Sequence, residues 1–230
     1  MVEIKGVKKT SLIDYPKHMC STLFLGGCNF KCGFCHNPLL VFNKVESVDE
    51  EKVIQSLIER KRNISAICIT GGEPLMNKGI IEFMSRLKSL GFLVKIDTNG
   101  YFPEVLKQLI DKKLVDHIAM DIKSSPEKYN RVTGVDINIE RINESVQLIK
   151  TSGINSEFRT TVVPGMITEK EITEIGKWLK GCKTYTLQQF RSTEDMIDES
   201  LKNINPYPLY KLDEFKEILN KFIDNVKIVN

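Results

Sequence analysis

Six short apolar runs, separated by segments with helical periodicity, constrain the fold of this chain more than any other feature. Each run is rich in aliphatic and β-branched residues and ends in polar or glycine-containing sequence; in order they are STLFLGG, AICITGG, FLVKIDTNG, HIAMDIK, SEFRTTVVPG and TYTLQQF. Strands that are buried on both faces of a parallel sheet have this nearly continuous apolar pattern. The alternation of strand and helix predicts right-handed βαβ units. Six units are too few for an eight-stranded barrel, so we expect an α/β fold, either a partial (β/α)6 TIM-like barrel or an open sheet.

The intervening segments have apolar residues at helical spacing. The strongest such stripe predicts a C-terminal helix over residues 208–224, with Leu209, Leu212 and Phe215 on its buried face. We find no convincing linker and no low-complexity stretch, so the 230 residues are expected to form one domain.

The charge balance argues against two classes of partner. The chain has 33 basic and 30 acidic residues, a net charge of +3, and the charges are interspersed, which gives no footprint for nucleic acid or an anionic membrane. No apolar run approaches the ~20 residues that span a bilayer, and the N-terminus lacks the apolar segment of a signal peptide. Clustered cysteines fit a reducing compartment, so a cytoplasmic location is predicted.

Every chemically suggestive motif directly follows one of the predicted strands. Three cysteines follow the first strand, and the later strands are followed by TGGEP, DTNG, DIK, VVPG and QQFR. In parallel α/β folds, functional sites lie at the carboxyl ends of the strands. The motifs are therefore expected to share one edge of the sheet.

The cysteines Cys28, Cys32 and Cys35 lie in one glycine-containing loop, GGCNFKCGFCHNP, and such spacing lets three sulfurs converge on one centre. Zinc would need His36 as its fourth ligand, but neighbouring residues rarely both reach one tetrahedral ion without strain. A [4Fe–4S] cluster needs four ligands, and three cysteines would leave one iron open to a substrate or cofactor. A cluster is therefore favoured over zinc. The separate cysteines Cys20, Cys68 and Cys182 are interpreted as buried apolar side chains.

With these motifs in order, the sequence resembles the radical S-adenosylmethionine (SAM) superfamily. The resemblance lies in Cys28-x3-Cys32-x2-Cys35, in Phe34 before the last cysteine, and in GGEP, DTNG and DIK farther along. The string CHNP is similar to the branch that activates glycyl radical enzymes, and the chain looks closest to the activating proteins of anaerobic ribonucleoside-triphosphate reductase. A single radical SAM domain with a core over residues 18–192 is expected.

The resemblance implies a radical oxidoreductase. A [4Fe–4S] cluster held by Cys28, Cys32 and Cys35 would reductively cleave SAM to a 5′-deoxyadenosyl radical, and the radical would abstract a hydrogen atom from a glycine of a partner glycyl radical enzyme. The expected partner is the large subunit of anaerobic ribonucleotide reductase, and the expected electron donor is flavodoxin or ferredoxin. No membrane partner and no clear nucleic-acid binding are expected.

The resemblance also implies roles for individual residues at the strand ends. Glu73 would accept from the amino group of SAM, Lys123 would neutralise its carboxylate, and Phe34 would lie against adenine. A monovalent cation would be held by Asp97, Thr98 and Asp121. The complete set expected to contact SAM is Phe34, Gly71, Gly72, Glu73, Asp97, Asn99, Lys123 and Arg159. For Arg159, inside an apolar strand, the residues alone leave two partners open, SAM and a structural acid.

Two other functions remain open. The first is a radical SAM enzyme acting on another substrate, such as a peptide, a nucleoside or tRNA base, or a small metabolite. The second is a zinc-binding or cluster-binding module without catalysis, which would leave the later strand-end motifs unexplained. The stretch after the cysteine loop, residues 37–49, has no cysteine and is too short for an inserted ferredoxin-like segment, which favours the compact type of activating enzyme.

Overall fold

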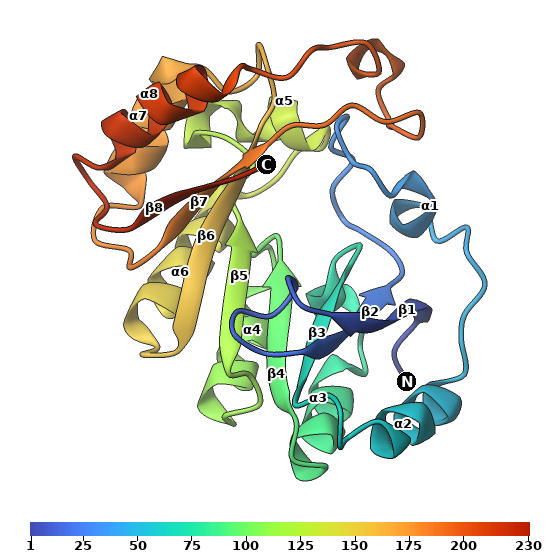
Figure 1. The fold of residues 1–230 in the computed structure, drawn as a ribbon. Coiled ribbons are helices and arrows are strands. Elements are labelled where there is room, and N and C mark those ends of the chain that lie inside the picture. The colour runs from blue at the N-terminus through green and yellow to red at the C-terminus, as the bar shows by residue number, and fades with distance from the viewer. The chain divides into compact units, whose positions relative to one another are not determined.

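A computed structural model describes residues 1–230, and the chain divides into two compact units (Figure 1). The first unit comprises Met1–Asn29 and Leu39–Ala119, and the second comprises Phe30–Pro38 and Met120–Asn230. The division falls within the cysteine loop and within strand β5 (His117–Asp121). The expectation of a single domain stays a prediction.

The first unit is built on four strands in the order β1-β2-β3-β4. They are β1 (Ile4–Ser11), β2 (Cys20–Leu25), β3 (Ala66–Gly71) and β4 (Leu93–Thr98). Strand β1 is antiparallel to β2, whereas β2, β3 and β4 are parallel. In the parallel part, Ala66 is level with both Cys20 and Leu93, so the three strands also end together. This register gathers the segments that follow β2, β3 and β4 at one edge.

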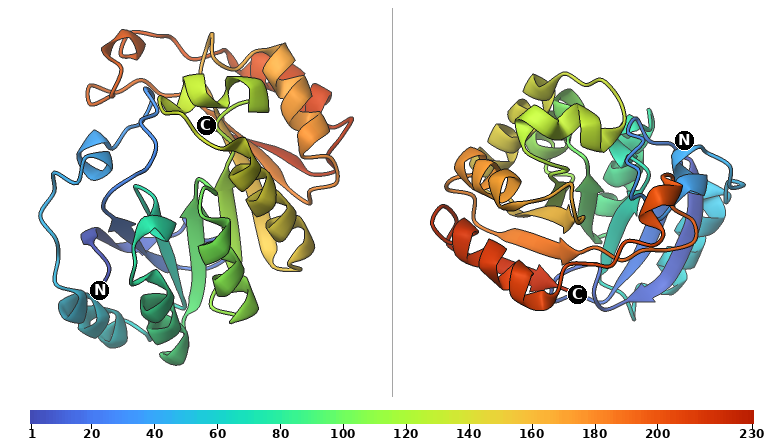
Figure 2. Two further views of the ribbon diagram at one scale, coloured as in Figure 1. Left: turned by 180° about the vertical axis from the view of Figure 1, so that it is seen from behind. Right: turned by 90° about the horizontal axis from the view of Figure 1, so that it is seen from above.

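The helices of the first unit have one buried apolar face each. They are α1 (Pro38–Val41, whose first residue belongs to the second unit), α2 (Glu50–Glu59), the 3-10 helix η1 (Pro74–Met76), α3 (Ile80–Ser89) and α4 (Pro103–Asp111). Helix α2 begins where the Asp49 side chain accepts a hydrogen bond from the Lys52 amide at 2.9 Å, as N-cap residues do. Helices α3 and α4 lie side by side, and α3 packs on β4 (Figure 2).

The second unit contains three parallel strands and the C-terminal helices. The strands are β6 (Asn155–Val162), β7 (Tyr185–Gln189) and β8 (Val226–Val229). The helices are η2 (Pro126–Lys128), α5 (Tyr129–Thr133), α6 (Ile139–Thr151), α7 (Glu169–Trp178), η3 (Glu199–Leu201) and α8 (Leu209–Leu219). Helices α7 and α8 pack side by side, and α8 covers β7 and β8 (Figures 1 and 2).

The predicted α/β class with mostly parallel strands is confirmed, because all six predicted strands are present as β2 to β7. Two further strands were not predicted. Strand β1 has only two fully buried residues in eight, and β8 is four residues long, so neither has a continuous apolar run.

The prediction of a C-terminal helix over residues 208–224 is wrong at its carboxyl end. Helix α8 ends at Leu219, and the amides of Phe222 and Ile223 close turns onto the Leu219 carbonyl. These turns lead the chain into β8. The apolar stripe continues past the helix because Ile223 is still buried, so periodicity alone could not locate the end.

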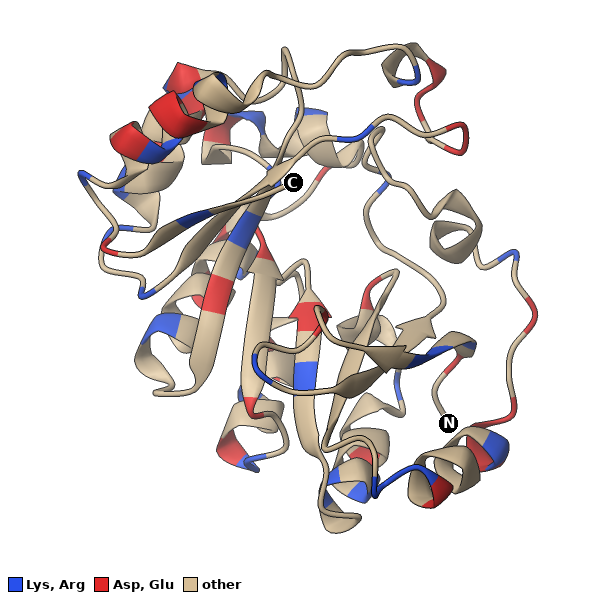
Figure 3. Ribbon diagram, viewed as in Figure 1, with Lys and Arg blue, Asp and Glu red and all other residues tan.

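Charged residues lie mainly on the helices and loops (Figure 3). Several strands carry charged residues as well: β4 has Lys95 and Asp97, β6 has Glu157 and Arg159, and β1, β5 and β8 also contain charged side chains. No helix is long and apolar enough to cross a membrane.

Candidate active site

The glycine pair after β3 brings two backbones into direct contact. A Cβ atom on Gly72 would lie 1.9 Å from the Gly27 carbonyl oxygen, and one on Gly71, at φ +123°, would lie 2.3 Å from the Leu25 carbonyl oxygen. The Glu73 amide then donates to the Gly27 carbonyl at 2.8 Å. Only glycine permits this approach. The pair therefore fixes the chain immediately before Cys28, a role that the sequence analysis did not assign to it.

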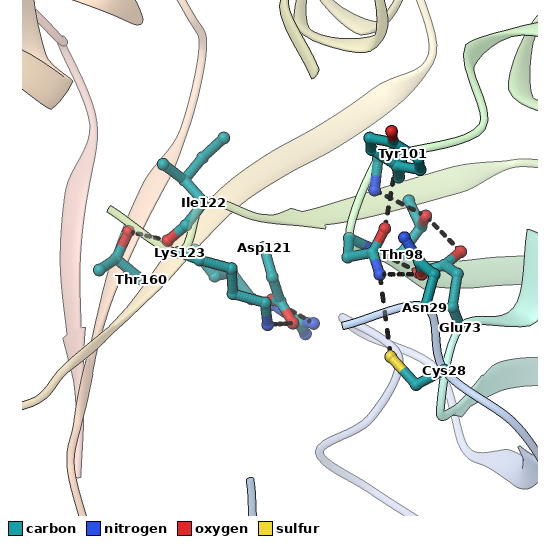
Figure 4. A network of polar contacts seen from close by, with 12 residues as sticks. Cys28, Asn29, Glu73, Thr98, Tyr101, Asp121, Ile122, Lys123 and Thr160 are labelled. Atoms are coloured by element: carbon teal, nitrogen blue, oxygen red, sulfur yellow. Dashed lines mark hydrogen bonds and ion pairs between the residues drawn. The ribbon is translucent and has the colours of Figure 1, made fainter. Parts of the chain in front are cut away.

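The Glu73 carboxylate organises the end of β4. It is fully buried, and it accepts hydrogen bonds from the Thr98 hydroxyl at 2.7 Å, the Asn99 amide at 2.6 Å and the Leu75 amide at 3.0 Å (Figure 4). A carboxylate has about four acceptor positions, so these bonds use most of its capacity. Glu73 thus joins the TGGEP and DTNG segments, and its predicted contact with SAM stays a prediction.

Asn99 extends this network to the first cysteine. Its side-chain nitrogen donates to the Asn29 side-chain oxygen at 2.8 Å and lies 3.9 Å from the Cys28 sulfur, while its oxygen accepts from the Tyr101 amide at 3.0 Å (Figure 4). Asn99 is almost completely buried. An N–H group directed at a cysteine sulfur is one of the interactions that tune a metal–thiolate centre.

Asp97 is paired with a lysine of its own strand. The Lys95 ammonium forms an ion pair with Asp97, and it lies 3.8 Å from the Cys68 sulfur. Lys95 is almost completely buried, and a buried ammonium needs such a partner. Lys95 was not predicted as a site residue; its place two residues before Asp97, on the same face of the strand, was the available signal.

In the second unit, the cysteine loop carries two cysteines in different environments. Cys32 is buried and Cys35 is partly exposed, and the Cys35 amide closes a turn onto the Cys32 carbonyl at 3.0 Å. Burial raises the pKa of the Cys32 thiol to about 11, although the positive charge of Lys123 opposes the increase. Phe34 is also buried. Without a bound metal, Cys32 is therefore a neutral thiol near pH 7.

Asp121, the last residue of β5, lies between two cations. The Arg159 side chain donates to its Oδ1 from both Nε and Nη2 at 2.9 Å, and the Lys123 ammonium lies 3.1 Å from Oδ2 (Figure 4). Although burial would raise it, these two cations lower the pKa of the Asp121 carboxyl to about 2. Arg159 thus has an acidic partner in Asp121, and its predicted contact with SAM stays a prediction.

Tyr129 was not predicted, and it supports this group from α5. Its hydroxyl accepts from the Lys123 amide at 3.2 Å and lies 3.4 Å from the Asp121 carbonyl oxygen, to which it donates. The ring is completely buried between Phe30 and Trp178. A tyrosine in a short polar segment gives little sequence signal, because its partners are backbone groups.

The remaining cysteines agree with the sequence analysis. Cys20, Cys68 and Cys182 are buried, and all six cysteines are free thiols. Neither unit by itself gathers three or more histidine, cysteine, aspartate or glutamate side chains that could hold a metal ion. The predicted cation ligands Asp97 and Asp121 each face basic side chains of their own unit, so the cation also stays a prediction.

The donor set nevertheless fits an iron–sulfur cluster. Three free thiols occur within eight residues of one loop, an amide N–H approaches Cys28, and a lysine charge acts on Cys32. Both features stabilise thiolates, the form in which cysteine binds metal.

Comparison with known families identifies the class. The model described as the radical SAM superfamily matches residues 22–179, and the chain belongs to this superfamily. It is therefore a radical SAM enzyme that uses a [4Fe–4S] cluster and SAM, as predicted. A relative from Methanocaldococcus jannaschii, named "Putative glycyl-radical enzyme activating enzyme", is 37% identical over 231 residues, which cover 98% of this chain and 95% of the relative.

Solved structures share the fold at low sequence identity. The Streptococcus suis enzyme SuiB, in a crystal structure with bound S-adenosylmethionine, has a TM-score of 0.70 at 15% identity, covering 89% of this chain and 48% of SuiB. This chain thus spans about half the length of SuiB. A domain of the pyruvate-formate lyase-activating enzyme from Bacteroides vulgatus has a TM-score of 0.57 at 15% identity, covering 72% of this chain and 99% of the domain. These similarities support the α/β fold class.

Proposed function

We propose that this radical SAM enzyme activates a glycyl radical enzyme. The main support for this proposal is the relative from Methanocaldococcus jannaschii whose name describes that activity, because it is 37% identical over 98% of this chain. The compact cysteine loop, followed by no further cysteine before Cys68, supports the small type of activating enzyme. The same proposal places the protein in the cytoplasm.

In this proposal the three cysteines of the loop, Cys28, Cys32 and Cys35, are the cluster ligands. The reduced cluster would supply one electron to cleave bound SAM, which provides the radical that takes a hydrogen atom from the partner's glycine. The chain's own residues prepare this chemistry by position and charge. The side-chain NH2 group of Asn99 would stabilise the Cys28 thiolate, and the Gly71–Gly72 pair holds the backbone immediately before Cys28.

We assign the SAM contacts to the polar groups at the strand ends. Lys123, paired with Asp121, would neutralise the SAM carboxylate, and Phe34 would lie against adenine. The other proposed contacts are Gly71, Gly72, Glu73, Asp97, Asn99 and Arg159, and a monovalent cation would use Asp97, Thr98 and Asp121. Each carboxylate would have to exchange a basic partner of its own for that cation.

The proposed partner is the large subunit of anaerobic ribonucleotide reductase, with flavodoxin or ferredoxin as electron donor. The test is to incubate the reconstituted enzyme anaerobically with SAM, a one-electron reductant and the reductase encoded in the same genome. A glycyl radical in the electron paramagnetic resonance (EPR) spectrum of the reductase, dependent on SAM and on Cys32, is expected. SAM cleavage without a glycyl radical on this or other glycyl radical enzymes would instead indicate another substrate.

A further inference from the structure

Two segments outside the cysteine motif hold the loop on either side of Cys32. One is the end of α5, at Thr133 and Gly134. The other is the stretch between β7 and α8, residues 191–208, which we call the strap. Both belong to the same unit as Cys32.

The α5 side acts on Lys31, the residue before Cys32. The Lys31 amide donates to the Thr133 carbonyl at 2.8 Å. Gly134, the C-cap of α5 at φ +68°, approaches so closely that a Cβ atom there would lie 2.6 Å from the Lys31 carbonyl oxygen. Gly134 thus has two reasons to be glycine, its left-handed backbone and this contact.

The strap acts on Gly33, the residue after Cys32. The Asp198 amide donates to the Gly33 carbonyl at 2.9 Å, and a Cβ atom on Gly33 would lie 2.8 Å from the Asp198 Cβ and 3.5 Å from a Leu201 methyl carbon. Farther along the loop, the His36 Nδ1 lies 3.4 Å from the Thr193 hydroxyl. The strap therefore lies directly on the cysteine loop.

The end of the strap is held at Tyr207, whose carbonyl accepts from the Gln189 side chain at 2.9 Å and whose hydroxyl accepts from the Gly165 amide at 3.3 Å. The part before it is anchored at fewer points. Met196 and Leu201 are buried, whereas most of residues 191–200 are exposed. Asp198 caps the short helix η3 by accepting from the Ser200 amide at 2.9 Å. Segments with few buried contacts open at a lower free-energy cost than packed strands. Of the two segments that contact the cysteine loop, the strap is therefore the easier one to detach by a single substitution.

From this arrangement we infer that Thr133–Gly134 and the strap form a clamp that positions Cys32 before any cluster is bound. The flanking residues Lys31 and Gly33 are held by backbone contacts, which limit where the Cys32 sulfur can lie in the cluster-free protein. Preorganised ligands give up less conformational entropy when a centre assembles. Leu201, Asp198 and Gly134 are then positioning residues for the cluster loop.

The test measures the alkylation rate of Cys32 in the cluster-free, reduced protein by peptide mapping, with buried Cys182 as the internal reference. Leu201→Ala removes a strap anchor, and we expect Cys32 to react at least about tenfold faster, while Cys182 reacts at the original rate. Leu201→Met, which keeps the volume, should restore slow alkylation. Gly33→Ala should act like Leu201→Ala, whereas Gly6→Ala, where a Cβ has ordinary space at 3.7 Å, should have no effect.

An unchanged Cys32 rate in both Leu201→Ala and Gly33→Ala would overturn the clamp. An equal acceleration at Cys182 would also count against it, because the strap would then act through the stability of the whole unit. After reconstitution, the EPR spectrum of the reduced cluster should change in Leu201→Ala and return in Leu201→Met. The inference that the clamp prepares a cluster site rests on the proposed role of Cys32 as a cluster ligand. The alkylation rate of Cys32, however, does not depend on whether the protein activates a glycyl radical enzyme.

Discussion

Among single residues, the polar side chains of the site form hydrogen bonds and ion pairs with one another. Glu73 is the clearest case, because its buried carboxylate accepts from Thr98, Asn99 and Leu75. The residue predicted as a SAM ligand is thus also a structural bridge between two strand ends.

Glu73→Gln separates these two roles. The glutamine side chain keeps the shape but replaces one acceptor oxygen by a donor, so a buried donor would face the Asn99 amide or the Thr98 hydroxyl. We expect the free energy of unfolding to fall by ~1–3 kcal/mol, measured by urea denaturation of the cluster-free protein. Unchanged stability with weakened SAM binding would show that Glu73 serves the ligand alone.

Asn99→Ala removes the N–H group that approaches Cys28. Hydrogen bonds to sulfur ligands stabilise the reduced, more negative cluster, so the midpoint potential should become more negative, by about 59 mV for each tenfold change in the one-electron equilibrium. Potentiometric titration followed by EPR measures this shift. Asn143→Ala provides the control, because this partly exposed asparagine of α6 donates to Glu140 of its own helix at 3.1 Å. An Asn99→Ala potential equal to that of the control would refute the contact.

At the scale of strands and helices, the register of the parallel strands sets where these residues meet. The sequence predicted all six of these strands and the motifs at their ends, because continuous apolar runs and terminal glycines have strong local signals. It could not predict that Gly72 is required by the Gly27 carbonyl, since close contact between segments far apart in sequence leaves no local pattern. The same reason explains why the strap was missed. Tyr129 was missed because its partners are backbone groups, whereas Lys95 had a local signal in its place two residues before Asp97.

Gly72→Ala tests the contact between the end of β3 and the cysteine loop. The added Cβ would lie 1.9 Å from the Gly27 carbonyl oxygen, so the loop must move. We expect reconstituted protein to hold much less iron per chain, measured against Gly6→Ala, which has ordinary space at its Cβ. Equal iron content in the two variants would mean that the close approach is dispensable.

Asp121 links the end of β5 to β6 through Arg159, and its ionisation gives this link a pH dependence. The carboxyl pKa is lowered from 3.8 to about 2, so the stabilisation is fully present above pH 3.8 and is lost as the pH falls toward 2. The shift corresponds to roughly 2 kcal/mol. Asp121→Asn should therefore lower urea stability near neutral pH, and its deficit relative to the original protein should shrink near pH 3.

A deficit for Asp121→Asn that is the same at both pH values would show that the carboxylate charge does not contribute. Arg159→Met offers a matched variant, because it removes the cation but keeps much of the side-chain length. It should lose most of the same pH-dependent stabilisation.

In the whole molecule, the residues proposed for the chemistry all lie in the part of the chain that defines the superfamily. The radical SAM match covers residues 22–179, and the three cysteines, the buried Glu73–Asn99 network and the Asp121 ion pairs all lie within it. The identity of the partner is part of the proposed function. SAM cleavage is instead expected from membership of the superfamily and its [4Fe–4S] cluster.

Radical SAM chemistry at the three cysteines is tested most directly by anaerobic reconstitution with iron and sulfide, followed by reduction in the presence of SAM and an assay for 5′-deoxyadenosine. We expect an oxygen-sensitive four-iron cluster and 5′-deoxyadenosine formation that Cys32→Ala abolishes. Zinc bound at one ion per chain, with no cluster and no cleavage of SAM, would contradict this expectation and would return the three cysteines to a structural role.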